Sequence, residues 1–428
     1  MKISLAYGRH GLSIDVPRGT KILSPRFIPG LQNEAGAIRR SLHSPINSPP
    51  LSDLLQSGQS VVIVHTDITR ATPNDRILPV VLRELEDHGI HRGDILLLNG
   101  LGTHRPQTDA ELRQMLGDEI VSNYRCLQHD CTNDDALVAL GQTRLGHPVR
   151  INKDYLSADI KILTGFIEPH FFAGFSGGPK AVLPALAGAE SVFTNHGQRM
   201  IAHPRATWGI TDTNPIWEEM KEMALLTKPD FLINVALNSK QEIIGVFSGD
   251  MLEAHRQGCA FVKDISMVPI PRPFDWAITT NSGYPLDQNL YQSIKGMSAA
   301  ARAVRPGGAI LMAAACEDGL PEHGLYAQLL REAGSPEEIL NTIAAPDFEA
   351  QDQWQVQIQA QIQQEAEIYV FSDGLTDEQI RGAHFSPCKD ISDFVQEMTA
   401  CKGPRGCVIP DGPQVIPYFV KDEDANHT

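Results

Sequence analysis

A glycine-rich stretch holds the densest group of reactive side chains in this sequence. Residues 165–196 read GFIEPHFFAGFSGGPKAVLPALAGAESVFTNH and contain His170, Lys180 and His196. Glycine lets a backbone approach a ligand closely, and successive N–H groups can then point at an anion. A lysine directly after the glycines suits either phosphate binding or nucleophilic attack. The stretch therefore predicts a binding loop that offers two imidazoles and one amine.

The loop taken alone allows other interpretations. Its sequence GFSGGPKA lacks the P-loop spacing G-x-x-x-x-G-K-[ST], and Ala181 replaces the hydroxyl that would bind Mg²⁺. This difference argues against a nucleoside triphosphatase. A flexible turn between a strand and a helix is the simpler interpretation. Phe171 and Phe172 beside His170 indicate a partly dry pocket instead, which favours a functional site.

Further reactive side chains follow predicted strands in the first half of the chain. The apolar runs 61–64, 94–99 and 158–166 have strand length, and each precedes a polar loop and a helical pattern. In an open parallel sheet, ligands bind at the carboxyl ends of the strands. This rule brings to one edge Asp67, Arg70, His104, His170 and Lys180.

Local signals predict several elements around these strands. The first 17 residues have the pattern of a hairpin that turns at residues 8–11. Asn74 is predicted to cap one helix, and Thr108 with Glu111 forms a capping box for the next. The helices would cover the sheet that carries the polar loops.

The second half of the chain repeats the alternation of strand and helix. A proline-rich segment at 269–273 marks our predicted boundary. Strands are predicted at 276–280, 309–315, 368–371 and 407–410, and helices at 288–304, 352–364 and 391–399. We therefore expect two α/β domains, residues 1–270 and 271–428, with largely parallel sheets and an active-site cleft between them. The acidic tail at 421–428 is expected to be frayed.

Composition excludes several classes of partner. The net charge of −16 disfavours nucleic acid and anionic membranes. The sequence contains no window of 18 apolar residues, so we expect no transmembrane helix. The first residues do not resemble a signal peptide. The seven cysteines form no C-x-x-C pair, which fits a reducing compartment. We expect a cytoplasmic protein.

A weaker polar group lies on the predicted helix 288–304. Gln292 and Lys295 are three residues apart and share one face, close to Tyr291. An exposed polar face is the usual interpretation of such a pair. A position near the interdomain cleft would make the pair part of a binding site.

Five blocks of sequence together resemble the nickel-dependent lactate racemase family. They are DITR at 67–70, GTHR at 102–105, EPHFFAGFSGGPK at 168–180, NHG at 195–197 and YQ-x-x-K at 291–295. The third block is specific, whereas the last two would be weak alone. Taken singly, the same residues could be a loop hydrogen bond, a core histidine or a surface ion pair.

The resemblance implies a cofactor and a role for each residue. The cofactor is a nickel-pincer nucleotide, a pyridinium mononucleotide with two sulfur arms, joined covalently to Lys180. Imidazole and sulfur suit square-planar Ni(II), and His196 would complete the nickel site. The implied acid–base pair is His104 and His170. The implied substrate contacts are Arg70, Lys295, Gln292 and Trp354, and the implied cofactor contacts are Asp67, Thr69, Gly177, Gly178 and Tyr291.

The resemblance also implies a reaction. It is the racemisation or epimerisation of a 2-hydroxy acid, in which a histidine takes the hydroxyl proton while the α-hydrogen leaves as hydride to the nucleotide. Lactate, larger 2-hydroxy acids and sugar acids all occur among the family's substrates, and cofactor-synthesis proteins would be partners. The alternative is a non-catalytic carrier of the nucleotide, which would need Lys180 and His196 but no acid–base pair. His65, His129, His147 and His203 match no block and are expected to be structural.

Overall fold

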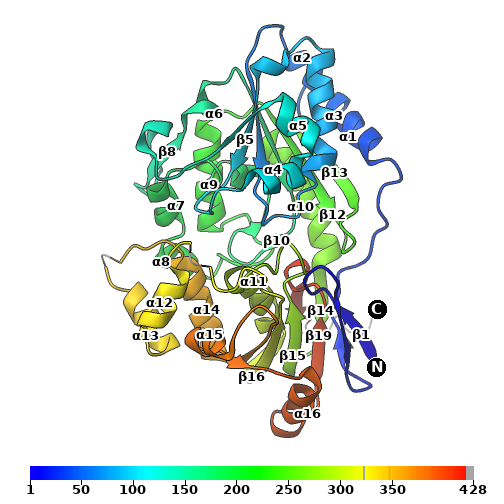
Figure 1. Cartoon of the computed structure of the whole chain (residues 1–428), viewed down its shortest axis with the longest axis vertical. Helices are drawn as coiled ribbons and strands as arrows, with labels where there is room; N and C mark the ends of the chain where they lie inside the picture. The colour runs from blue at the N-terminus through cyan, green and yellow to red at the C-terminus, as the bar shows by residue number, and fades with distance from the viewer. Residues whose placement is uncertain (322, 347, 421–428) are drawn as a thin grey trace.

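Two six-stranded sheets form the framework of the chain (Figure 1). The computed structural model describes residues 1–321, 323–346 and 348–420, so the predicted frayed tail lies outside the described residues. The first sheet occupies the upper half of Figure 1 and the second sheet the lower half. The arrangement confirms the predicted α/β class with largely parallel sheets.

The first sheet is parallel except at one edge. Its strands, in spatial order, are β13 (Ile243–Gly249), β12 (Phe231–Leu237), β9 (Ile160–Phe166), β4 (Val61–Thr66), β5 (Ile95–Gly100) and β6 (Arg125–Gln128). Edge strand β13 runs antiparallel to β12, and the other neighbouring pairs are parallel. Continuous runs of Val, Ile and Leu favour such strands because both faces are buried.

Helices cover both faces of the first sheet. On one face, α1 (Glu34–His43) and α3 (Asn74–Asp87) pack Ile38 and Ile77 with Ile63 of β4. On the other face lie α7 (Ala189–Asn195), α9 (Pro215–Leu226) and α10 (Met251–Ser266). The remaining elements of this half are α2 (Leu51–Leu54), α4 (Asp109–Leu116), α5 (Asp118–Asn123), β7 (Leu137–Gln142), β8 (Pro148–Asn152), α6 (Lys153–Ser157), β10 (Pro169–His170), β11 (Gly174–Phe175) and α8 (Gln198–Ile201).

Two local predictions can be compared with the helix ends. The capping box of Thr108 and Glu111 at the start of α4 is confirmed. The predicted cap at Asn74 is wrong by one residue, because Pro73 occupies the cap and Asn74 is the first helical residue. Proline is tolerated at the cap because the φ of Pro73, −79°, lies within the range that its ring allows.

The second sheet is parallel throughout. Its strands, in spatial order, are β18 (Ser386–Pro387), β17 (Ala366–Phe371), β16 (Val304–Ala313), β15 (Phe274–Thr280), β19 (Gly406–Ile409) and β3 (Lys21–Ile22). On one face lie α11 (Leu290–Ala301) and α14 (Gln353–Glu365), and on the other lies α16 (Ile391–Cys401). The peripheral helices are α12 (Tyr326–Glu332), α13 (Pro336–Ile343) and α15 (Asp377–Gly382).

The start of the chain belongs to the second sheet rather than the first. The predicted hairpin is present as β1 (Lys2–Leu5) and β2 (Leu12–Asp15). Its buried Leu5 and Ile14 pack with Trp276 of β15. The hairpin and β3 therefore pack with the half of the chain that follows the predicted boundary at residue 270, although they precede it in sequence. The apolar face of the hairpin packs on the same face of the second sheet as α16. Both elements thereby cover apolar side chains of that sheet.

The predicted proline-rich joint at 269–273 begins in a short strand and continues as a bend before β15. Residues 267–270 form β14, which pairs in parallel with β20 (Ile416–Phe419) near the end of the chain. The link between the halves is therefore tied down by backbone hydrogen bonds. None of the helices in the described residues is both long and apolar enough to cross a membrane.

Candidate active site

A buried cavity of about 110 Å³ lies where the carboxyl ends of β4, β5 and β9 meet α11 and α14. From the first half it is lined by Asp67, Arg70, His104, His170, Gly177, Lys180 and His196, and from the second half by Tyr291, Gln292, Lys295 and Trp354. As predicted from the carboxyl ends of the parallel strands, the cavity gathers residues that are more than a hundred positions apart in sequence. Of the predicted site residues, Thr69 and Gly178 do not line this cavity.

Asp67 anchors the loop that follows β4. Its Oδ1 accepts hydrogen bonds from the backbone N–H and the hydroxyl of Thr69, at 2.8 and 2.5 Å. Its Oδ2 lies 3.2 Å from Nδ1 of His104 and 3.9 Å from Nε of Arg70. These partners, His104 first, hold the pKa of the buried Asp67 carboxyl below its usual range despite the cost of burial.

His170 lies in an apolar corner of the cavity. Its ring is 4.9 Å from that of Phe171 and 4.5 Å from that of Phe172. Nδ1 accepts a hydrogen bond from the backbone N–H of Ala173 at 3.3 Å. Burial, followed by the charges of Lys180 and Lys295, lowers the pKa of His170 well below its ordinary value. The imidazole is therefore neutral at physiological pH.

His196 is held between aromatic rings from both halves of the chain. Its ring lies 5.0 Å from that of Phe172 and 5.1 Å from that of Trp354, both edge-on. The backbone N–H of His196 caps α7 by donating to Val192. Nδ1 is buried and has no hydrogen-bond partner among the described residues. Burial lowers the pKa of His196 to about 3, so a neutral nitrogen is free to act as a ligand.

Three N–H groups of the glycine-rich loop donate to acceptors within the protein, so binding of an anion by the loop stays a prediction. The N–H of Ser176 donates to Glu168, that of Gly178 to Oδ1 of Asn234, and that of Lys180 to Gly177. These donors are therefore satisfied within the protein. Gly178 does not line the cavity and its N–H donates to Asn234, so the cofactor contact predicted for it stays a prediction.

Gly177 and Gly178 are glycines for steric reasons. Their φ angles are +77° and +53°, a region that other residues rarely adopt. A Cβ on Gly177 would lie 2.5 Å from Oδ1 of Asn234, and one on Gly178 would lie 2.5 Å from Cγ of His255. His255 also bonds the carbonyl of Ser176 through Nε2 at 2.9 Å. Asn234 on β12 and His255 on α10 therefore fix the shape of the loop.

Lys180 is a half-buried lysine without an ion-pair partner in the described part of the chain. Its Nζ lies 5.5 Å from the centre of the Phe172 ring. Burial, then the nearby charges of Arg70 and Lys295, lowers the pKa of Lys180 well below its ordinary value. An unprotonated amine is a nucleophile, so the loop presents a reactive group to the cavity.

The second half of the chain contributes a cation and an aromatic wall. Lys295 on α11 is buried, and its Nζ has no hydrogen-bond partner among the described residues. The Oε1 atom of Gln292, one turn earlier, is also buried and unpartnered. Trp354 donates from Nε1 to the hydroxyl of Tyr291 at 2.9 Å. Because α11 carries these groups into the cavity, the interpretation of an exposed polar face is wrong.

Two titratable residues in this region received no role from the sequence. Glu168 is buried with Oε2 unpartnered, and its pKa is raised by burial although Lys295 and Arg70 oppose the shift. His65 lines the cavity, its Nε2 is buried and unpartnered, and burial lowers its pKa to about 4. Glu168 follows a strand and precedes the glycine-rich loop, a position that gave no chemical signal, and His65 looked like the end of a buried strand.

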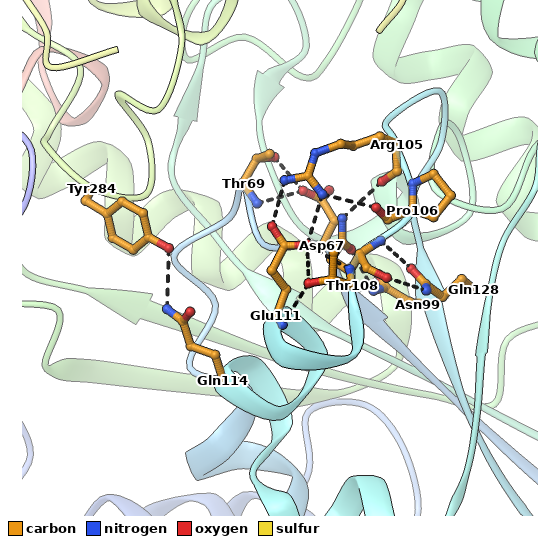
Figure 2. A network of polar contacts seen from close by, with 11 residues as sticks. Asp67, Thr69, Asn99, Arg105, Pro106, Thr108, Glu111, Gln114, Gln128 and Tyr284 are labelled. Carbon is orange, nitrogen blue, oxygen red and sulfur yellow. Dashed lines mark hydrogen bonds and ion pairs between the residues drawn. The ribbon is translucent and has the colours of Figure 1, made fainter. Parts of the chain in front are cut away.

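A second cavity of about 500 Å³ adjoins the first and shares His104, Tyr291 and Gln292 with it. Thr69 lies on its wall. The loop after β5 forms the same wall, where Arg105 pairs with both carboxylate oxygens of Glu111 at 2.6 and 2.9 Å (Figure 2). This ion pair holds the loop that carries His104.

Two largely parallel sheets covered by helices, with a buried cavity of imidazoles and cations at their junction, define an enzyme that acts on a small molecule. The model of the lactate racemase N-terminal domain matches residues 7–209, and that of the lactate racemase C-terminal domain matches residues 271–417. The chain belongs to the lactate racemase family, and it is accordingly an isomerase of the racemase class.

Individual relatives agree with this assignment. Lactate racemase of Thermoanaerobacterium thermosaccharolyticum is 34% identical over 97% of this chain and 98% of its own length. Lactate racemase of Lactiplantibacillus plantarum is 39% identical over 90% of this chain and 91% of its own. The lactate racemase apoprotein structure from the first organism superimposes with a TM-score of 0.88, at 33% identity, over 98% of this chain and all of that one. A Thermotoga maritima protein, 20% identical with a TM-score of 0.73 over 90% of this chain and 98% of that one, shares the fold.

Proposed function

We propose that the chain inverts the carbinol carbon of a 2-hydroxy acid, with lactate as the first candidate and larger 2-hydroxy acids next. The observation that carries this proposal is the gathering of His104, His170, Arg70 and Lys295 around one buried cavity. A substrate carboxylate needs cationic partners when it leaves water, and a carbinol hydroxyl needs a proton acceptor. The named activity of both relatives supports lactate.

We further propose a nickel-pincer nucleotide as the cofactor, held by Lys180 and His196. The unpartnered, buried Nδ1 of His196 fits a nickel ligand, and the unprotonated amine of Lys180 fits a covalent attachment point. The described residues contain no cluster of three or more His, Cys, Asp or Glu that could hold a metal. A nickel ion at His196 would therefore take its other ligands from the cofactor. When bound, the nucleotide would supply a pyridinium ring that accepts the α-hydrogen as hydride and returns it.

The chain's own residues would bind and orient the substrate. Arg70 and Lys295 approach the cavity from opposite halves of the chain, so a carboxylate between them would fix the substrate across the junction. His104, supported by Asp67, would take the hydroxyl proton. Phe171 and Phe172 exclude water from the side of His170, which strengthens the electrostatic contacts.

The test is enzyme produced together with nickel and the cofactor-synthesis proteins. We expect interconversion of D- and L-lactate, or of a larger 2-hydroxy acid, together with an intact mass that shows an adduct on Lys180. His196→Ala should abolish activity, whereas His203→Ala, which alters an exposed histidine outside the cavity, should not. An adduct-bearing protein that racemises no 2-hydroxy acid would support the carrier alternative and overturn the proposal.

A further inference from the structure

The partner of His104 determines which ring nitrogen carries a proton. Nδ1 of His104 lies 3.2 Å from Oδ2 of Asp67. Asp67 is ionised, since its partners hold its pKa below the usual range, and a carboxylate can only accept a hydrogen bond. Nδ1 must therefore be the N–H donor. In the neutral ring, Nε2 is then left with a lone pair, and it has no partner in the described part of the chain.

The partner of His170 requires the opposite arrangement. Nδ1 of His170 faces the backbone N–H of Ala173 at 3.3 Å, and a peptide N–H can only donate. Nδ1 must therefore be the acceptor, and the proton of the neutral ring lies on Nε2. The packing of Phe171 and Phe172 against this ring opposes a flip that would exchange its nitrogens.

We propose that Asp67 and the N–H of Ala173 act as positioning groups that fix His104 and His170 in opposite tautomers in the substrate-free enzyme. His104 presents a proton acceptor at Nε2, and His170 presents a hydrogen-bond donor at Nε2. The catalytic meaning of this difference rests on the proposed function. The positions of the ring protons do not depend on the proposed function, because they follow from the hydrogen-bond partners Asp67 and the N–H of Ala173.

The two histidines are therefore not equivalent toward the two enantiomers. A substrate whose hydroxyl faces His104 can transfer its proton directly to Nε2. A substrate whose hydroxyl faces His170 finds an N–H group at Nε2, which cannot accept a proton. Reaction from the second position requires the proton of His170 to move to Nδ1, at the expense of the bond from Ala173. Because racemisation has an equilibrium constant of one, kcat/KM is equal for the two enantiomers. The difference therefore lies in kcat and KM separately, which change together for each enantiomer.

The experiment is ¹⁵N NMR of the full-length, cofactor-free chain with ring-labelled histidine, at about pH 8, above the ordinary histidine range. His104→Gln and His170→Gln each remove one set of signals and so assign them. His129 and His255 serve as internal references, since their Nε2 atoms face the carbonyls of Ala187 and Ser176 and must carry protons.

We expect a proton on Nδ1 of His104 and none on Nδ1 of His170, and any other distribution over these two atoms overturns the proposal. Asp67→Asn should raise the fraction of His104 with its proton on Nε2 and leave His170 unchanged, whereas Asp135→Asn, an exposed control, should change neither. An unchanged His104 in Asp67→Asn would show that Asp67 does not position the ring. The sample contains no cofactor or substrate, so a failure of racemase activity is a separate result.

Discussion

Oδ2 of Asp67 lies 3.2 Å from Nδ1 of His104, so a buried carboxylate is hydrogen-bonded to one of the two cavity imidazoles. The same oxygen lies 3.9 Å from Nε of Arg70. One side chain therefore supports both the candidate base and a candidate carboxylate-binding group. Its own charge is maintained by these contacts and by the N–H and hydroxyl of Thr69.

Replacement of Asp67 should impair turnover more than folding. We expect Asp67→Asn to lower kcat at least about tenfold, roughly 1.4 kcal/mol in the transition state, because an amide no longer fixes or stabilises the protonated His104 ring. Steady-state kinetics of the cofactor-loaded enzyme measure this effect. Asp135→Asn is the matched control. A kcat within twofold of the parent would show that the carboxylate has no part in the reaction.

Binding of the substrate carboxylate should depend on pH through Lys295. Burial and the charge of Arg70 lower the pKa of Lys295 below the ordinary lysine range, although Glu168 opposes the shift. The ammonium form is present below this pKa and is lost as the pH rises through it. Since this pKa is lowered to about 7, we expect KM for a 2-hydroxy acid to increase as the pH rises through neutrality.

Substitution at the same position provides the check. Lys295→Arg keeps a positive charge at every accessible pH, so its KM should be less dependent on pH. Lys295→Ala and Arg70→Ala should each lower kcat/KM at least about tenfold. Near-normal kinetics in both alanine variants would place the substrate elsewhere.

The fold and much of the site follow from the sequence because they depend on local patterns and strand ends. The apolar runs of β4, β5 and β9 predicted a parallel sheet, and the rule for its carboxyl edge gathered Asp67, His104 and His170. The hairpin formed by β1 and β2 was also predictable locally. Its position was not, because the sheet that buries Leu5 and Ile14 comes from the other end of the chain.

The shape of the glycine-rich loop could not be deduced in this way. Its glycines suggested an anion site, but their steric reason is contact with Asn234 and His255, which follow Gly178 by more than fifty residues. Asn234 lies on a largely apolar strand and His255 on an amphipathic helix, so neither residue carried a local signal. The single Asn within β12 and the His within α10 acquire their role only when those elements pack beneath the loop.

The contact between Asn234 and the loop leads to a further prediction. Oδ1 of Asn234 accepts the hydrogen bond from Gly178, and Asn234→Ala leaves that buried N–H unpaired, at a cost of about 1–3 kcal/mol. We expect lower stability and slower formation of the Lys180 adduct, measured by intact mass over time. Asn234→Asp retains an acceptor and should restore adduct formation in part. Equal adduct rates in the alanine variant and the parent would contradict this role.

Lys180 should weaken the cofactor-free fold. Its pKa is lowered by burial, so the unfolded chain binds more protons than the folded chain between the lowered pKa and the ordinary lysine value. Stability attributable to this group therefore falls as the pH decreases through that window. Lys180→Met removes the penalty and should stabilise the protein by on the order of 1–3 kcal/mol near neutral pH, with a smaller gain toward the ordinary lysine pKa. Urea unfolding at several pH values, with the exposed Lys263→Met as control, measures the difference.

The fate of the α-hydrogen distinguishes the proposed reaction from proton abstraction by the two histidines. The α-hydrogen beside a carboxylate is very weakly acidic, and the neutral, buried imidazole of His170 is a poor base for it. If the hydrogen leaves as hydride and returns within the cavity, product formed in D₂O should contain little deuterium at Cα, as read by proton NMR and mass spectrometry. Substrate deuterated at Cα should react more slowly. His104→Gln and His170→Gln should each suppress turnover of both enantiomers, because kcat/KM must stay equal in the two directions. Substantial solvent deuterium at Cα would establish a two-base proton mechanism, even if both histidines proved essential.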